Sequence, residues 1–186
     1  MSSEDDKYTL KMVLAGDGAV GKTSLRMQYL GYGFKAQYLE TVGADFALKQ
    51  EDVFGKTVEF TIWDLAGQQR FQSVRTAYYR GALAALVVFD ITRWQTFKNL
   101  GPWINEIWKN NGSGIIPVVI LGNKYDLREQ ALLDVEEQEV LDFCTELSKK
   151  TQEEGFDVKF FYTSAKTGLN VKEAFQALAQ VYFNSL

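Results

Sequence analysis

The sequence predicts an α/β fold, in which helices cover both faces of a mostly parallel sheet. Near-continuous apolar runs at residues 8–15, 83–89 and 115–121 are typical of strands buried on both faces. Stretches with helical periodicity lie between these runs, as crossover helices of a parallel sheet require. The 186 residues, of which 46% are apolar and 24% charged, suffice for one globular domain with a full core.

The first half of the chain is expected to form a strand, a helix, a surface loop and a hairpin. These elements are predicted at residues 8–15, 24–30, 31–41, and 44–50 paired with 56–64. Val58, Phe60 and Ile62 occupy alternate positions of the last segment, which is a strand signal. Gly55 lies where the chain must reverse, so the two segments are predicted to pair as a hairpin.

The second half is expected to add three helices and a weaker strand at 156–162. The helix predicted at 94–110 contains Pro102, which indicates either a bend or a later start of this helix. Two more helices are predicted to open at Asp134 and Asn170, each followed three residues later by a glutamate in capping-box spacing. In such a fold, ligands bind beyond the carboxyl ends of the strands.

The segment after the first strand has the phosphate-binding pattern G-x-x-x-x-G-K-[ST]. It comprises Gly16, Asp17, Gly18, Ala19, Val20, Gly21, Lys22 and Thr23, and Ser24 follows at the start of the helix. The glycines let backbone N–H groups turn toward phosphate oxygens, and the helix N-terminus favours the same anion. Lys22 can reach the β- and γ-phosphates, and the Thr23 hydroxyl can ligate Mg²⁺. So short a pattern also occurs by chance in plain turns, but the strand–loop–helix setting favours a binding site.

Residues that are missing or rare exclude several classes of active site. The chain has no histidine, which excludes Ser-His-Asp and Cys-His catalysis and histidine-ligated metals. The single Cys144 allows no internal disulfide, fits a reducing cytoplasmic setting, and is expected to be a buried helix residue. The net charge of −4 argues against general nucleic-acid binding. No apolar run approaches the length of a membrane span, and we expect a flexible acidic leader at 1–7 before a single domain at 8–186.

Two further candidate elements concern the phosphate end of a nucleotide. Asp64 and Gly67 lie directly after the second hairpin strand, where a carboxylate can hold Mg²⁺ through water and a glycine lets a backbone N–H approach a γ-phosphate. Gln68 follows them, and Thr41 lies in the predicted surface loop. Taken alone, an aspartate after a strand is usually a helix cap or part of a turn.

Two other elements point to a guanine base. Asn123, Lys124 and Asp126 follow the strand at 115–121, and the sequence Ser-Ala-Lys at 164–166 follows the last strand. The Asp126 carboxylate is an acceptor that matches the N1–H and exocyclic amine of guanine, a pair of donors that adenine does not present. Each motif alone is weak, but their joint occurrence in this order, after successive strands, makes chance negligible.

This set of motifs resembles the small Ras-like GTPases from about residue 7 to residue 182, and within them the Rab branch most of all. The segments similar to Rab signatures are 42–46, 62–63, 70–71, 78–82 and 89–92, with Ala44 where Val is usual. The resemblance implies the G-domain form of the P-loop NTPase fold, a six-stranded, mostly parallel sheet with one antiparallel edge strand and helices on both faces. It also implies that the domain at 8–186 binds GTP and GDP.

The resemblance further implies a role for each matching residue. Gln68 would orient the attacking water, and Lys22, Thr41 and Gly67 would act with it by holding the γ-phosphate, while Gly18 occupies a position where a side chain would crowd the hydrolysis site. Mg²⁺ would be held by Thr23, Thr41 and Asp64. The nucleotide-binding set comprises Gly16, Asp17, Gly18, Ala19, Val20, Gly21, Lys22, Thr23, Ser24, Phe34 (against the guanine), Tyr38 (over the phosphates), Thr41, Gly67, Asn123, Lys124, Asp126, Ser164, Ala165 and Lys166.

The implied function is a molecular switch that hydrolyses GTP slowly, in membrane traffic or a related process. No helical insertion between Thr23 and Thr41 is long enough to supply a catalytic arginine in cis, so an activator in trans is expected to accelerate the reaction. Arg70 is the nearest arginine of the chain, and a surface ion pair is its expected role. Exchange factors, activators and effectors would be the protein partners of a monomer, and the loops around the γ-phosphate would be what they contact. The family's exposed aromatic triad for effectors matches Phe46, Trp63 and Tyr78, although such aromatics are also common core residues.

Some positions depart from the family pattern. Leu65 and Gln69 replace the usual Thr and Glu, which puts the contacts of exchange factors and activators in question. The sequence ends at Leu186 without a C-terminal cysteine pair or C-a-a-X box, so we expect a cytoplasmic protein, peripheral to membranes only if a lipidated tail or a partner is missing from this chain. Two alternatives remain. The Asn123–Asp126 motif argues against a P-loop kinase or ATPase, and the presence of Gln68 argues against a module that binds GTP without hydrolysing it.

Overall fold

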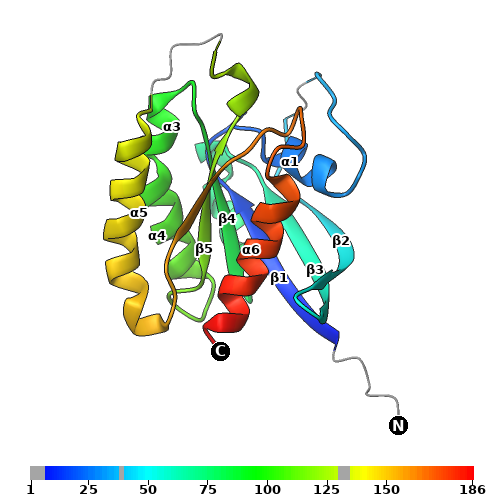
Figure 1. The fold of residues 1–186 in the computed structure, drawn as a ribbon, viewed down its shortest axis with the longest axis vertical. Helices are drawn as coiled ribbons and strands as arrows, with labels where there is room; N and C mark the ends of the chain where they lie inside the picture. Colours follow the sequence, from blue (N-terminus) through cyan, green and yellow to red (C-terminus); the bar gives the residue numbers. More distant parts are fainter. Residues whose placement is uncertain (1–6, 38–39, 130–134) are drawn as a thin grey trace.

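The computed structural model describes residues 7–37, 40–129 and 135–186, which form a six-stranded sheet with helices on both faces (Figure 1). The strands are β1 Lys7–Ala15, β2 Ala44–Val53, β3 Lys56–Leu65, β4 Ala84–Asp90, β5 Val118–Asn123 and β6 Lys159–Tyr162. Their order is β2-β3-β1-β4-β5-β6, with β2 antiparallel to β3 and every other neighbouring pair parallel. The predicted fold class is therefore confirmed, including the antiparallel edge strand.

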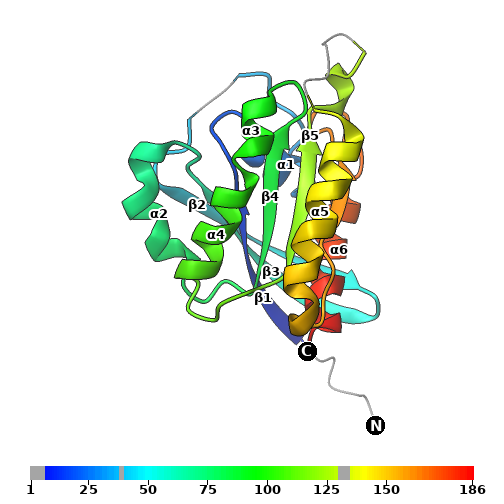
Figure 2. The same cartoon turned by 90° about the vertical axis from the view of Figure 1, so that its left-hand side faces the viewer.

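Six α-helices cover the sheet. They are α1 Lys22–Tyr29, α2 Gln72–Tyr79, α3 Trp94–Lys98, α4 Leu100–Asn110, α5 Glu137–Thr151 and α6 Val171–Asn184. Apolar residues of α1 and α6 pack on one face of the sheet, and those of α2, α3, α4 and α5 pack on the other. In Figure 1, α6 crosses in front of the strands, and the quarter turn of Figure 2 brings α3, α4 and α5 toward the viewer. None of the helices in the described ranges combines the length and apolarity that crossing a membrane would need.

Burial on both faces explains why β4, β5 and residues 12–15 of β1 are almost wholly apolar, whereas β3 alternates polar and apolar residues. Leu10, Met12 and Leu14 of β1 enter the cluster under α1 and α6, whereas Val13 and Ala15 enter the cluster under α2 to α5. Residues of β4 and β5 are divided between the same two clusters, so neither set of alternate positions in the middle of these strands can be polar. β1 begins at Lys7, one residue before the predicted boundary of the domain.

The hairpin of β2 and β3 turns at Phe54 and Gly55, whose φ angles are 50° and 80°. Positive φ at both central residues is the geometry of a two-residue hairpin turn, and glycine adopts it without strain. Phe54 takes this conformation and is 70% exposed.

The stretch predicted as one helix at 94–110 is two helices, α3 and α4, which meet at Asn99. Pro102 therefore lies in the first turn of α4, where a missing N–H breaks no intrahelical hydrogen bond. Neither of the two alternatives describes this break, because α3 begins at Trp94 as predicted and the interruption lies at Asn99, before Pro102.

Neither predicted capping box forms as expected. Asp134 lies outside the described residues, and α5 begins three residues later with a box between Glu136 and Glu139. Asn170 precedes α6 but makes no side-chain cap, since it is left-handed and its Nδ2 donates to Tyr162 O at 2.9 Å. Residue spacing alone cannot distinguish a cap from a tie to a neighbouring strand.

Candidate nucleotide-binding site

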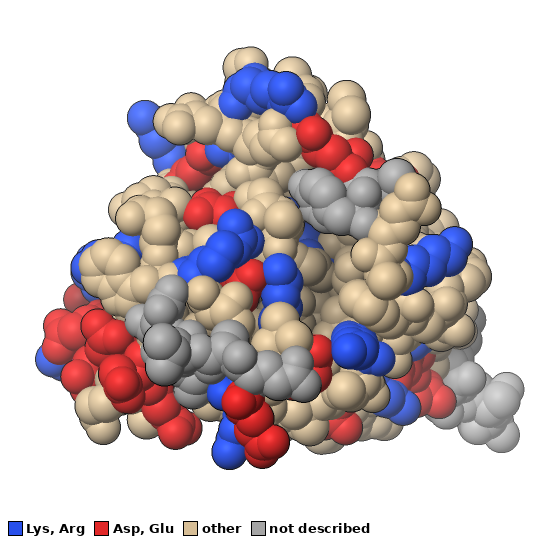
Figure 3. Space-filling model, turned by 90° about the horizontal axis from the view of Figure 1, so that it is seen from above, with Lys and Arg blue, Asp and Glu red and all other residues tan. Residues whose placement is uncertain are grey.

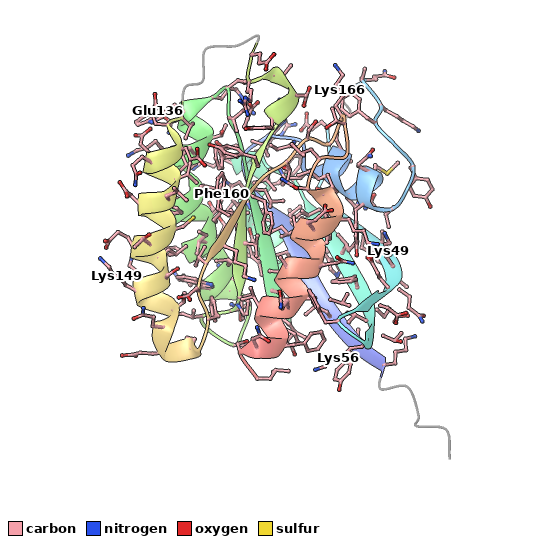
Figure 4. All side chains as sticks on the ribbon, viewed as in Figure 1. Lys49, Lys56, Glu136, Lys149, Phe160 and Lys166 are labelled. Carbon is pink, nitrogen blue, oxygen red and sulfur yellow. The ribbon has the colours of Figure 1, made fainter. Side chains whose placement is uncertain are left out.

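The carboxyl ends of the parallel strands lie at one edge of the sheet, and the predicted site residues follow them. Figure 3 looks down on this end of the molecule, where Lys and Arg side chains lie around the middle of the face. In Figure 4, Lys166 lies at this end and Lys56 at the opposite one. A cavity of about 250 Å³ opens here, lined by Gly18, Ala19, Gly21, Lys22, Thr23, Ser24, Met27, Phe34, Lys35, Ala36, Gln37, Glu40, Thr41, Gly67, Gln68 and Lys124. It connects the phosphate-loop pattern with the loops that carry Thr41 and Gly67.

The loop between β1 and α1 depends on its glycines for steric reasons. Gly16 and Gly21 have φ angles of 136° and 102°. A methyl group on Gly16 would collide with the backbone oxygen of Val88, and one on Gly21 would collide with the amide nitrogen of Asn123. Ala19 also lies in the left-handed region, at φ 61°. The loop therefore packs so closely against β4 and β5 that neither glycine leaves room for a side chain.

Lys22 is buried inside this loop. Its Nζ donates to the carbonyl oxygens of Gly16 and Asp17, each at 2.8 Å. Burial lowers the pKa of the Lys22 ammonium to about 8, although the charges of Asp64 and Asp17 raise it. A buried ammonium held only by neutral carbonyls favours an anion in the adjacent cavity.

Two hydroxyl groups and a carboxylate converge at the start of α1. Thr23 Oγ1 donates to Asp64 Oδ2, so the 3.0 Å contact between Thr23 and Thr41 uses the Thr41 hydroxyl as donor. Asp64 is buried, and desolvation raises its pKa against the hydrogen bond from Thr23 and the charge of Lys22. Its Oδ1 atom is buried and has no hydrogen-bond partner among the described residues. An unpaired carboxylate oxygen beside two hydroxyls is an oxygen donor set of the kind that Mg²⁺ takes.

Gly67 is pressed against the phosphate loop. A Cβ on Gly67 would lie 2.5 Å from Gly18 N and 2.6 Å from Asp17 O. These distances are shorter than any that a real Cβ atom adopts, so only glycine fits at this position. A Cβ on Gly18 would lie 3.6 Å from Gln68 Cγ, an ordinary contact. The Gln68 side chain therefore lies beside Gly18 at the mouth of the cavity.

Asn123 lies at the end of the site where the base is predicted to bind, and its buried side chain holds two loops together. Its Nδ2 donates to Val20 O at 2.9 Å, and its Oδ1 accepts from Thr163 Oγ1 and Ala165 N, both at 3.2 Å. The amide thus ties the phosphate loop to the loop after β6. With all of these bonds made internally, its contribution is to position the two loops.

Asp126 and Lys124 lie next to Asn123. Asp126 Oδ1 accepts from Ser164 Oγ at 2.6 Å, and Oδ2 has no hydrogen bond to the described residues. Lys124 is left-handed at φ 70°, and its Nζ forms an ion pair of 2.7 Å with Asp90. Ala165 is buried and Lys166 exposed. Phe34 is 43% exposed on the cavity wall, and Tyr38 lies outside the described residues.

Sequence reasoning missed the contacts that fix the phosphate loop from the side of α4. Asp17 accepts from Asn99 Nδ2 at 2.7 Å and from Trp103 Nε1 at 2.8 Å. Arg93 donates to Gly18 O at 3.0 Å and pairs with Asp90 at 3.1 Å. The sequence did contain one signal for these contacts, namely Asp17 itself. A carboxylate in an anion-binding loop needs hydrogen-bond donors from another part of the protein.

The three aromatic residues of the predicted triad form one surface. Phe46 stacks on Trp63 at 5.1 Å between ring centroids, and Trp63 lies 5.2 Å from Tyr78. Phe46 is 54% exposed and the other two are half-buried. Of the departures noted in the sequence, Leu65 is a core residue, which explains an apolar side chain there, and Gln69 is exposed.

Comparison with known proteins agrees with this geometry. The model of the Ras family matches residues 11–184. The chain is 38% identical to Ras-related protein Rab-13 of Bos taurus over 173 residues, which covers 93% of this chain and 79% of that protein. It is 39% identical to RABA5e of Arabidopsis thaliana over 189 residues (100% and 81% covered), and 40% identical to Rab-7a of Dictyostelium discoideum over 177 residues (94% and 82% covered).

Proposed function

Because the chain belongs to the Ras family of small GTPases and so hydrolyses GTP, we propose that it is a Rab-like switch of membrane traffic whose GTP and Mg²⁺ bind in the cavity described above. One observation carries this proposal. Thr41 and Gly67 come from separate loops, yet both contact the segment 16–23, which is the arrangement expected where a γ-phosphate is sensed from two sides. The relation to Rab proteins supports the trafficking role.

In this proposal the phosphate groups are held by charge and by backbone donors. The buried ammonium of Lys22 neutralises the β- and γ-phosphates, and the N–H groups of Thr41 and Gly67 donate to the γ-phosphate. The first turn of α1 adds backbone N–H groups, since Gly21 at its start provides no side-chain cap.

The donor set around Thr23 fits Mg²⁺. Thr23 and Thr41 would ligate the ion through their hydroxyls, and Asp64 through water, which would satisfy its unpaired oxygen. The ion, when bound, neutralises charge that develops on the β- and γ-oxygens.

Hydrolysis is assigned to positioning of the attacking water. The Gln68 side chain lies beside Gly18 at the mouth of the cavity, where its amide can orient a water molecule toward the γ-phosphate. Arg70 forms an ion pair with Glu40, so this exposed arginine is occupied in the closed arrangement of the loops. Intrinsic turnover is therefore slow, and an activator supplies the missing charge.

Base selection is assigned to Asp126. Its Oδ2 has no hydrogen bond to the described residues, whereas Oδ1 is fixed by Ser164, so the carboxylate is oriented and still able to accept from guanine. Phe34 and Lys124 would enclose the base, with the Ala165 N–H held near it by Asn123.

Loss of the γ-phosphate would remove an anchor from each loop, and partners would distinguish the two states. The aromatic surface of Phe46, Trp63 and Tyr78 adjoins both loops in sequence and is the proposed contact of effectors. Exposed Gln69 removes a charge beside Gln68 and is expected to alter the choice of exchange factor or activator.

The test is mass spectrometry of the nucleotide released from purified protein, followed by single-turnover hydrolysis. GDP or GTP is expected; ADP or no nucleotide would overturn the assignment. Gln68→Leu should keep GTP bound with hydrolysis lost, and Thr23→Asn should disfavour the GTP state. In cells of the source organism, fluorescent fusions of these two variants should distribute differently between vesicle membranes and the bulk cytoplasm. Identical distributions would contradict the trafficking role.

A further inference from the structure

Arg75 of α2 is a buried arginine with hydrogen bonds to the backbone on both sides of Gly67. Only 3% of the residue is exposed. Its Nη1 donates to Gln68 O at 2.8 Å and reaches Ala66 O at 3.4 Å. Both carbonyls belong to residues that flank Gly67, so one nitrogen holds the segment that carries the predicted γ-phosphate sensor and the predicted water-orienting glutamine.

The guanidinium is itself fixed by Glu106 of α4. The two side chains form a bidentate pair, with Nε 2.7 Å from Oε1 and Nη2 3.1 Å from Oε2. Tyr79 and Gln72 also donate to Glu106, at 2.9 Å and 3.0 Å. A bidentate pair fixes the plane of a guanidinium as well as its place. Arg75 therefore cannot rotate without breaking several charge-assisted bonds at once.

The same helix also holds the phosphate loop. Trp103 of α4 lies under Arg75, with the guanidinium carbon 4.2 Å from its ring centre. The indole N–H of Trp103 donates to Asp17, as does the amide of Asn99. α4 is thus a common support for the phosphate loop and, through Arg75, for the segment 66–68. The backbone of Gly67 in turn contacts the backbone of Asp17 and Gly18, so the segment 66–68 and the phosphate loop also touch each other directly.

We propose that Arg75 is a positioning residue for GTP hydrolysis, which fixes the Gly67 N–H and the Gln68 side chain relative to the phosphate loop by holding the carbonyls of Ala66 and Gln68 against α4. This inference rests on the proposed roles of Gly67 and Gln68. Arg75 acts through the backbone of those residues, and its own contacts are all within the protein. It follows that residues 66–68 stay anchored after the γ-phosphate has left, so the mobile part of this loop begins after Gln68.

A purely structural brace would have the same contacts but different consequences. Buried ion pairs can often be replaced by apolar pairs of similar size without loss of stability, whereas removal of one partner leaves a buried charge. The double variant Arg75→Met with Glu106→Gln removes both charges, keeps an acceptor for the Tyr79 hydroxyl and lacks the hydrogen bonds to residues 66 and 68, so it should remain folded. A change in its hydrolysis rate can then be assigned to the lost hydrogen bonds and not to a loss of stability.

The experiment measures single-turnover GTP hydrolysis, GDP affinity and thermal unfolding of this double variant. Hydrolysis is expected to slow by about 10- to 100-fold, because misplacement of about 1 Å in an active site has effects of that size. GDP affinity is expected to stay within about threefold of the unchanged protein, since the segment contacts only the γ-phosphate side. Amide hydrogen exchange at residues 66–68 in the GDP state should become faster.

A matched control comes from another half-buried carboxylate network, far from the site. Glu51 accepts from Tyr29 at 2.5 Å and Gln176 at 2.9 Å, and pairs with Lys172 at 3.1 Å. Glu51→Gln should lower stability without changing hydrolysis or exchange at 66–68. Arg75→Lys, which keeps the charge but cannot form the planar fork, should give an intermediate hydrolysis rate.

The outcomes are distinguishable. A folded double variant that hydrolyses GTP within about threefold of the unchanged protein would overturn the role of Arg75. If the double variant is unstable, the hydrolysis rate of Arg75→Lys is used instead, and a rate within about threefold of the unchanged protein would again overturn the role of Arg75. Gln68→Leu in the same assay tests the proposed function separately. If Gln68→Leu hydrolyses GTP at the normal rate, the catalytic role of Gln68 is wrong whatever the Arg75 variants show. If Gln68→Leu is inactive and the Arg75 variants hydrolyse GTP at the normal rate, only the positioning role of Arg75 is wrong.

Discussion

The addition of one methyl group at Gly67 should block the closed arrangement of the site. In the structure a Cβ at this position would lie 2.5 Å from Gly18 N and 2.6 Å from Asp17 O. Comfortable contacts between such atoms lie at about 3.5 Å, so Gly67→Ala must push the two loops apart by about 1 Å. Gly67 is not among the glycines with positive φ, so the obstacle is this contact and not backbone strain.

A displacement of about 1 Å of the γ-phosphate donor and of the adjacent Gln68 is expected to slow hydrolysis about 100-fold, equivalent to about 2.7 kcal/mol in the activation free energy. The assay is single-turnover hydrolysis of preloaded GTP, with dissociation of a fluorescent GDP analogue measured in parallel. GDP dissociation should be nearly unchanged, because the N–H of Gly67 is assigned to the γ-phosphate alone.

Gly18→Ala is the matched comparison, since its Cβ would meet only the Gln68 side chain, at 3.6 Å. That side chain can rotate, so closure should survive and the loss of hydrolysis should be smaller than for Gly67→Ala. Hydrolysis by Gly67→Ala within about threefold of the unchanged protein would refute the closed geometry as the reactive one.

Three other predictions test the rest of the structure. Burial raises the pKa of the Cys144 thiol to about 12, so alkylation of the folded protein near pH 8.5 should be slower than that of the denatured protein by a factor of about 10³. The unfolded thiol ionises first, so the contribution of Cys144 to the free energy of unfolding should fall as the pH rises above 9; equal labelling rates would contradict both statements. Gly101→Ala in α4 adds helix propensity, but Pro102 follows directly and disfavours helical backbone for a preceding residue that has a Cβ, so urea unfolding should show less than the gain of about 1 kcal/mol expected at an ordinary helix position; a gain of that full size would count against the helix boundaries. The exposed pair of Arg70 and Glu40 should contribute no more than about 1 kcal/mol in a double-mutant cycle, and a larger coupling would mean that the two loops are joined far more firmly than the exposure suggests.

Local signals predicted most of the architecture. Continuous apolar runs identified the buried strands, because a strand covered on both faces leaves no polar position. Boundaries were less certain: the run at 115–121 gave a strand that begins only at Val118, directly after Pro117, and the run at 156–162 gave one that begins at Lys159. Apolar residues before those points are buried in loops, and burial alone does not distinguish a loop from a strand.

The site divides in the same way. Most of its motif residues could be proposed from the sequence because they follow strand ends, which the topology brings together, whereas Thr41 lies in the loop before β2. The support given by α4 could not be found, since Arg75 and Glu106 are 31 positions apart and Asp17 and Trp103 are 86 apart. Such pairs depend on how α2, α4 and the phosphate loop approach one another, and no spacing in the sequence encodes that approach.

The two loops that would sense the γ-phosphate are fastened unequally, and this difference bears on how a switch could signal. Residues 66–68 are held through a buried arginine to α4, which also holds the phosphate loop. Among the described residues of the loop that ends at Thr41, the hydroxyl contact to Thr23 and an exposed ion pair of Glu40 fasten it, and exposed pairs are weak. Loss of a phosphate contact therefore removes a larger share of what holds Thr41 than of what holds Gly67. The proposed switch should accordingly change mainly in the Thr41 loop and in the residues after Gln68, and a partner specific for the GTP state should depend more on those segments than on Gly67.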